Sequence, residues 1–123
     1  KAELDALFDA ANLKKSYTFT SDPREAAKGA DVFYTDVWVS MGKEDEKAER
    51  IKTMSPYQVN EKLVELGAKD SIFMHCLPAH AGEEVSEGVL RSDKSIVFDQ
   101  AENRLHVQKA IVSWLVGKNR QSR

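Results

Sequence analysis

The sequence predicts an α/β fold in which a parallel sheet lies between two layers of helices, giving three layers in all. Three short apolar segments, at positions 32–35, 72–74 and 95–98, carry β-branched and aromatic residues and indicate buried strands. Stretches with helical spacing of apolar residues separate these segments. Such regular alternation of strands and helices is typical of a parallel, Rossmann-like sheet that is covered on both faces.

The first helix is expected over positions 2–13, where Leu4, Leu7 and Phe8 lie on one face. The alternating, β-rich residues at 17–20 predict a short additional strand.

Proline, glycine and charge patterns define the remaining helices. Pro23 suits a first helical turn, and Gly29 suits the position after a helix end. The charge-dense stretch 43–50 predicts a solvated helix. The expected helices cover 21–28, 42–54, 59–66, 83–90 and 101–116.

Length and composition restrict the class of protein. The 123 residues are enough for one domain at most. A net charge of -2 provides no basic face for nucleic acid, and the apolar runs are too short to span a membrane. A single Cys favours a reducing, intracellular compartment. Because the chain starts at Lys1 without Met, we expect it to be a fragment of a longer protein.

Polar residues follow directly after the predicted strands. Asp36, His75 and Asp99 each stand at the end of an apolar segment. Open parallel sheets bind ligands outside the carboxyl ends of their strands, so these residues mark an expected small-molecule site. The sequence contains no glycine-rich dinucleotide motif and no phosphate-loop lysine motif, so a nucleotide ligand is not indicated.

Two candidates before position 43 each have two interpretations. Asp36 can receive a substrate ammonium group, or it can simply cap a helix. Ser40-Met41-Gly42 can close over a ligand as a lid, or it can be a capping serine with a methionine packed inward.

The run from His75 to His80 contains the only Cys and a proline turn. Cys76 and His80 could form the dyad of a hydrolase if the turn at Pro78 folds back. His75 would point to the opposite face of a continuing strand. Structural zinc usually requires four ligands, so we expect no metal here, and a buried, inert Cys is the remaining alternative.

Arg104 indicates an anion site. Asp99 and Glu102 fit a capping box at the start of the last helix, which would place Arg104 near its first turn. A cation there is unfavourable beside the positive helix end unless an anion binds. Neutralisation of Arg104 by Glu102 is the alternative.

These motifs together resemble the ornithine carbamoyltransferase family, from about Asp22 to Val116. The combination of Asp-x-Trp-x-Ser-Met-Gly with His-Cys-Leu-Pro is highly specific. The segments that carry the resemblance are Thr35-Asp36-Val37-Trp38-Val39-Ser40-Met41-Gly42, Pro56-Tyr57-Gln58-Val59-Asn60, Phe73-Met74-His75-Cys76-Leu77-Pro78-Ala79-His80 and Phe98-Asp99-Gln100-Ala101-Glu102-Asn103-Arg104.

The resemblance implies carbamoyl transfer from carbamoyl phosphate to the side-chain amine of ornithine, giving citrulline and phosphate without a metal or organic cofactor. It implies that Asp36, Ser40 and Met41 hold ornithine. Cys76 and Leu77 would line the place where the carbamoyl group meets the amine, and Arg104 would bind carbamoyl phosphate. Catalytic roles therefore fall to Asp36, Cys76 and Arg104. His75 belongs to the motif without an assigned role.

The resemblance also implies that residues 1–123 form an incomplete ornithine-binding domain. The family's amino-terminal domain would supply the rest of the carbamoyl phosphate site, and trimers are its basic assembly. The resemblance places the protein in arginine metabolism, in the cytoplasm or the mitochondrial matrix. A stand-alone module that binds a small amino acid is the alternative function.

Overall fold

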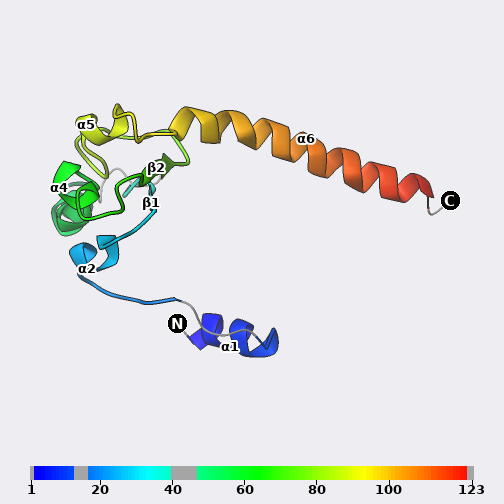
Figure 1. Ribbon diagram of the computed structural model, residues 1–123, viewed down its shortest axis with the longest axis horizontal. Helices are drawn as coiled ribbons and strands as arrows, with labels where there is room; N and C mark the ends of the chain where they lie inside the picture. Colours follow the sequence, from blue (N-terminus) through cyan, green and yellow to red (C-terminus); the bar gives the residue numbers. More distant parts are fainter. Residues whose placement is uncertain (1, 13–16, 40–46, 122–123) are drawn as a thin grey trace.

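The computed structural model describes residues 2–12, 17–39 and 47–121, with side chains described as far as residue 117. Two parallel strands and several helices make up this part of the chain (Figure 1). In chain order the elements are α1 (Ala2–Ala10), α2 (Pro23–Ala27), β1 (Val32–Thr35), α3 (Lys47–Met54), the 3₁₀ turn η2 (Ser55–Tyr57), α4 (Glu61–Val64), β2 (Ile72–His75), α5 (Glu87–Leu90) and α6 (Val97–Gln121). Most predicted helices are therefore present, and α2, α4 and α5 are shorter than expected; positions 42–46 of the predicted helix 42–54 lie outside the described residues.

Strands β1 and β2 form the sheet, pairing in parallel from Val32 beside Ile72 to Thr35 beside His75. This register confirms the two predicted strands and brings their carboxyl ends to one edge. Because Thr35 pairs with His75 at the ends of the two strands, the residues that follow them leave the sheet next to one another. The sheet thus fixes the position of the expected site.

The predicted third strand at 95–98 is wrong for most of its length. Ser95 forms a single parallel bridge with Phe73, and the Ile96 N–H donates to the Phe73 carbonyl at 3.0 Å. Helix α6 then begins at Val97. A short apolar run does not distinguish a strand from a buried helical turn, and here the helix-favouring residues that follow extend the helix backward.

The predicted strand at 17–20 is also absent. Its alternating aromatic residues instead pack against one another and against α1. Tyr17 lies between Phe8 and Phe19, with ring centroids 5.4 and 5.3 Å apart. Its hydroxyl donates to the Asp5 carboxylate, and this hydrogen bond raises the pKa of Tyr17 to about 12. The segment thus contacts α1 through aromatic rings without pairing to a strand.

The core lies around β2 and the short helices beside it. Its buried residues come from α2, both strands, α4, α5, the start of α6 and two loop positions, 59 and 85, which ties these segments together. They are Ala27, Phe33, Val59, Val64, Phe73, Val85, Val89 and Val97. Helices α2, α4 and α5 begin at side-chain caps, supplied by Asp22, Asn60 and Ser86 respectively.

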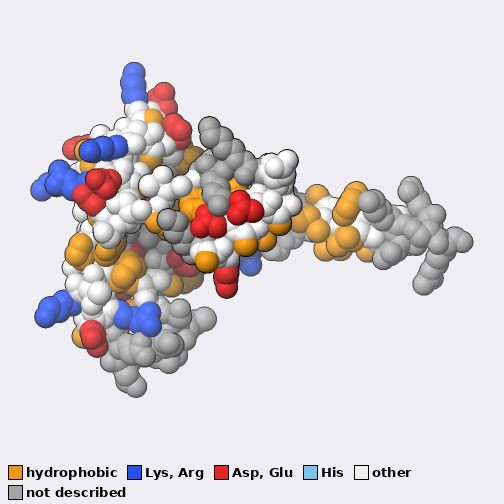
Figure 2. Space-filling model, turned by 90° about the horizontal axis from the view of Figure 1, so that it is seen from below, with side chains coloured by type: hydrophobic (Ala, Val, Ile, Leu, Met, Phe, Trp, Pro, Cys, Tyr) orange, Lys and Arg blue, Asp and Glu red, His pale blue; other side chains and the backbone are white. Residues whose placement is uncertain are grey.

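Helix α6 leaves this core at its first turn and extends away from it (Figure 1). Val97 is buried, whereas the large apolar residues farther along the helix are exposed. Figure 2 shows orange apolar side chains on the projecting part of the molecule. Within the described residues, no helix is long and apolar enough to cross a membrane.

Candidate functional site

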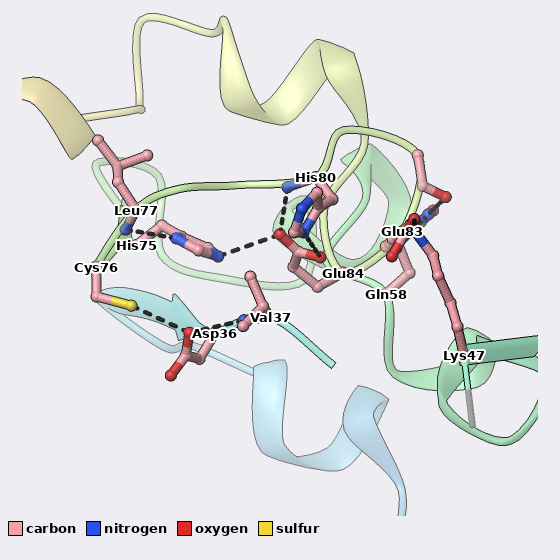
Figure 3. Close-up of polar contacts among 11 residues, drawn as sticks. Asp36, Val37, Lys47, Gln58, His75, Cys76, Leu77, His80, Glu83 and Glu84 are labelled. Atoms are coloured by element: carbon pink, nitrogen blue, oxygen red, sulfur yellow. Dashed lines mark hydrogen bonds and ion pairs between the residues drawn. The ribbon is translucent and has the colours of Figure 1, made fainter. Parts of the chain in front are cut away.

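Asp36 and Cys76 meet at the edge of the sheet where β1 and β2 end. The Cys76 thiol donates to Asp36 Oδ1 at 3.1 Å, and the Val37 N–H donates to the same oxygen at 2.7 Å (Figure 3). Both side chains are exposed, so a ligand can reach them. Of the three residues expected at this edge, only Asp36 lies in the exposed site: His75 is buried, and Asp99 lies inside α6.

The hydrogen bond between the two residues shifts their pKa values in opposite directions. Donation from the thiol is the main cause that lowers the pKa of Asp36, with a further contribution from the Val37 N–H. The same bond raises the pKa of Cys76 above its ordinary value, and the negative charge of Asp36 adds to the effect. The pair therefore favours a carboxylate beside a neutral thiol, because the thiol is the donor.

His75 lies fully inside the protein and supports the turn that carries Cys76. Its Nδ1 accepts a hydrogen bond from the Leu77 N–H at 2.9 Å, so the ring proton resides on Nε2. Nε2 lies 3.2 Å from Oε1 of Glu84, a carboxylate that is itself completely buried. His75 thus links the turn to the interior and does not face the exposed site.

Leu77 contributes its backbone to the site more than its side chain. Its φ of 57° lies in the left-handed region, and a cis peptide bond joins it to Pro78. Its half-buried side chain packs against the core. A left-handed leucine costs of the order of 1 kcal/mol, and such outliers concentrate at functional sites.

Arg104 lies about two turns into α6, which corrects its predicted location at the first turn. The helix begins at Val97, so Asp99 and Glu102 are inside it and form no capping box. Glu102 instead lies 3.3 Å from His106. The argument from the helix end is therefore wrong, although the charge of Arg104 acts on Cys76 and lowers its pKa slightly against the effect of Asp36.

Two residues that sequence reasoning did not single out hold the site in place. Gln100 Oε1 accepts from the His75 N–H at 3.0 Å, and its Nε2 donates to the Tyr34 hydroxyl at 3.1 Å. It thereby ties α6 to the ends of both strands. Glu84 accepts from the His80 N–H at 2.6 Å as well as facing His75. Gln100 lies within one of the segments that carry the family resemblance. No spacing pattern distinguishes Glu84 from the adjacent Glu83.

A cavity of about 700 Å³ opens beside the end of β1. Asp36 lies on its wall together with Trp38, Arg50 and Tyr57. The volume is sufficient for an amino acid, and the lining mixes aromatic surface with charged groups, as ligand sites do. Ser40 and Met41, which were expected to hold the ligand, lie outside the described residues.

The geometry gives little support to a cysteine hydrolase. A nucleophilic Cys requires a depressed pKa and a base as its partner. Here the partner of Cys76 is a carboxylate that raises the thiol pKa, and His80 is directed toward Glu84 (Figure 3). The thiol is better suited to position a ligand than to attack one.

The fold and this site define an α/β domain with exposed polar groups at the carboxyl ends of two parallel strands. The family described as "Aspartate/ornithine carbamoyltransferase, Asp/Orn binding domain" matches residues 3–115, and the chain belongs to this family.

Several curated relatives have the name ornithine carbamoyltransferase. The protein from Ignicoccus hospitalis is 53% identical over 118 residues, which cover 92% of this chain and 38% of the relative. The protein from Methanothermobacter thermautotrophicus is 60% identical over 96 residues, covering 78% of this chain and 32% of the relative. This chain therefore spans about a third of the length of these relatives.

Solved structures show the same relation. The ornithine carbamoyltransferase from Pyrococcus furiosus shares 59% identity with a TM-score of 0.70, covering 75% of this chain and 29% of that one. The ornithine transcarbamoylase from Giardia lamblia shares 34% identity with a TM-score of 0.79, covering 90% and 34% respectively.

Proposed function

We propose that this chain provides the ornithine-binding part of an ornithine carbamoyltransferase. The reaction would transfer the carbamoyl group of carbamoyl phosphate to the side-chain amine of L-ornithine, giving L-citrulline and phosphate. The contact between Asp36 and Cys76 at the strand ends, in a member of this family, is the observation that carries the proposal. Relatives named ornithine carbamoyltransferase, at 52% identity or more, support ornithine as the amino acid.

The proposed roles follow the chemistry of each group. Asp36 is ionised beside the cavity and would pair with the ammonium group of ornithine, assisted by Ser40 and Met41. Cys76 and the backbone of Leu77 would line the position where amine and carbamoyl group meet. Arg104 would provide positive charge for the phosphate. His75 would keep the turn in shape, since it holds the Leu77 N–H.

The rate would come from orientation and electrostatics. The uncharged amine nitrogen of ornithine attacks the carbonyl carbon, and the bond from that carbon to the phosphate oxygen breaks as phosphate leaves with its electron pair. The amine gives up one proton, so the products are citrulline, phosphate and a proton. Holding both substrates together and stabilising the developing charge are the contributions expected of the protein. No covalent intermediate on Cys76 is required.

We further propose that a second domain, outside residues 1–123, completes the carbamoyl phosphate site. The exposed apolar residues of α6 offer a surface against which such a domain could pack. The parent enzyme would assemble as a trimer and work in the cytoplasm, in arginine metabolism. The chain alone would then be inactive, because it holds only part of the site.

Citrulline formation from ornithine and carbamoyl phosphate tests the proposal in the full-length parent protein. Asp36→Asn is expected to raise the KM for ornithine by about tenfold or more, because the ion pair between the Asp36 carboxylate and the ammonium group of ornithine is lost. Lys69→Gln, an exposed substitution before the amino end of β2 and thus at the opposite edge of the sheet, is the matched control and should leave KM unchanged. A parent without activity, combined with tight ornithine binding by the 123-residue chain, would instead support a stand-alone amino-acid-binding module.

A further inference from the structure

Glu84 has an unusual environment behind the turn that carries Cys76. Its side chain is fully buried, and Oε1 accepts from the His80 N–H at 2.6 Å while lying 3.2 Å from His75 Nε2. Oε2 has no hydrogen-bond partner among the described residues, although it is buried. A buried carboxyl oxygen without a hydrogen-bond partner is costly, so a cation that paired with it would be stabilised.

The free oxygen of Glu84 faces two further groups that can bind a metal. His80 Nδ1 lies 3.9 Å from Oε2, and the His80 side chain is 47% exposed, so solvent reaches it. Glu83 is adjacent, and one potential ligand atom from each of the three residues lies within 4.8 Å of the others. Neighbouring ligands of a tetrahedral zinc ion are separated by about 3.3 Å, so small side-chain rotations suffice to close the site.

The loop that carries these groups is already held by hydrogen bonds. Gln58 Nε2 donates to the carbonyl oxygens of Gly82 and Glu83, at 3.1 and 2.8 Å. The Gly82 N–H donates to the Val85 carbonyl at 2.8 Å. Binding would therefore require little ordering of the backbone, which lowers its entropic cost.

We propose that His80, Glu83 and Glu84 form a binding site for a divalent transition-metal cation, with Zn²⁺ as the representative ion. His80 Nδ1 and Glu84 Oε2 would be ligands together with a carboxylate oxygen of Glu83, and water would complete the coordination. One imidazole and two carboxylates suit borderline cations of this kind. The proposal lies outside the carbamoyl transfer reaction, for which no step uses this ion.

Lys47 competes with the proposed cation. Its ammonium group lies 2.7 Å from Glu83 Oε1, so it occupies one of the carboxylates with positive charge (Figure 3). A bound metal would either share the Glu83 carboxylate with Lys47 or displace the Lys47 ammonium group from it. Removing the lysine charge should therefore strengthen binding, and dependence on the His80 imidazole distinguishes this site from an unspecific acidic surface.

The test is an equilibrium titration of the chain with Zn²⁺ in competition with a chromophoric chelator. Cys76→Ser serves as the background, so that the thiol cannot contribute. His80→Ala should weaken binding by more than about tenfold, as losses around metal sites do. Its backbone N–H still reaches Glu84, and circular dichroism checks that the fold is retained. Lys47→Gln should strengthen binding severalfold.

His106→Ala provides the matched control, because His106 is also exposed and lies 3.3 Å from a glutamate, Glu102. Binding that is unchanged in this variant but lost in His80→Ala supports the site. Absence of Zn²⁺ binding at millimolar concentration overturns it. Equal binding by His80→Ala, or loss only in His106→Ala, places the metal elsewhere and also overturns the proposal.

Discussion

At the scale of single residues, the Asp36 carboxylate determines how Cys76 behaves. The thiol donates to a carboxylate at 3.1 Å, so losing its proton removes that bond and places two negative charges together. Both effects raise the pKa of Cys76 above its ordinary value of 9.0. The exposed thiol should thus be less reactive than an ordinary cysteine near neutral pH, since the thiolate is the nucleophile.

Replacing Asp36 with Asn should reverse this effect. The amide carries no charge, so the pKa of Cys76 falls toward its ordinary value and more thiolate is present at pH 8. Alkylation by iodoacetamide should then be severalfold faster than in the unchanged chain, and the midpoint of the rate profile should move to lower pH. In concentrated urea the two proteins should react alike. Equal rates in the folded state would show that the carboxylate does not control the thiol.

The contacts that the sequence predicted least well are those of the side chains that surround His75 behind the site. Apolar runs followed by Asp36 and His75 were sufficient to predict that the strand ends, and with them Asp36 and Cys76, converge. The roles of Gln100 and Glu84 depend on His75, which lies 25 and 9 positions away respectively. No local pattern encodes such a pairing, nor the left-handed backbone of Leu77.

At the scale of elements, the boundary between β2 and α6 shows why short apolar segments mislead. Residues 94–96 contribute hydrogen bonds to β2, as a third strand would, but the helix starts at Val97. Burial of Val97 satisfies the apolar pattern equally well in either conformation. The shift of the helix start also moved Arg104 away from the first turn, so one boundary error produced the error in the predicted location of Arg104.

Packing between the sheet and α4 gives a prediction at this scale. A Cβ atom at Gly67 would lie 2.6 Å from the Phe33 ring and 2.9 Å from the Ala30 carbonyl oxygen. One of these contacts is backbone, so Gly67→Ala should destabilise the fold by about 1–3 kcal/mol through overpacking. Urea denaturation, analysed with the same m-value for both proteins, measures this change in the free energy of unfolding.

Gly88→Ala is the matched comparison, in α5. Its Cβ would meet the end of the Glu61 side chain, which can turn away into solvent because Glu61 is exposed. Turning Glu61 away breaks the hydrogen bond that the Ser86 hydroxyl donates to its Oε1 at 3.0 Å, and the helical preference of Ala, up to about 1 kcal/mol over Gly, offsets that loss. Gly88→Ala should therefore stay near the stability of the unchanged chain. A larger loss from Gly88→Ala than from Gly67→Ala would contradict the packing described for Gly67.

At the scale of the whole molecule, α6 carries apolar surface that the described part of the chain does not cover. Val107, Ile111, Trp114 and Leu115 recur at helical spacing, and each is at least half exposed. Helices of this kind owe most of their stability to packing of the apolar face. A contiguous exposed stripe of this kind normally marks an interaction surface.

The chain in isolation should therefore bind a hydrophobic dye such as anilinonaphthalene sulfonate, and mainly along α6. Replacing Ile111 and Leu115 together with Gln should remove most of the dye fluorescence, because both side chains are 50% exposed and belong to this stripe. The core around β2 does not contain them, so urea denaturation should be unchanged. Lys109→Gln, on the same helix, should leave the fluorescence as it was. Dye binding that persists in the double variant would place the accessible apolar surface near the sheet, and α6 would then not be the surface that a second domain covers.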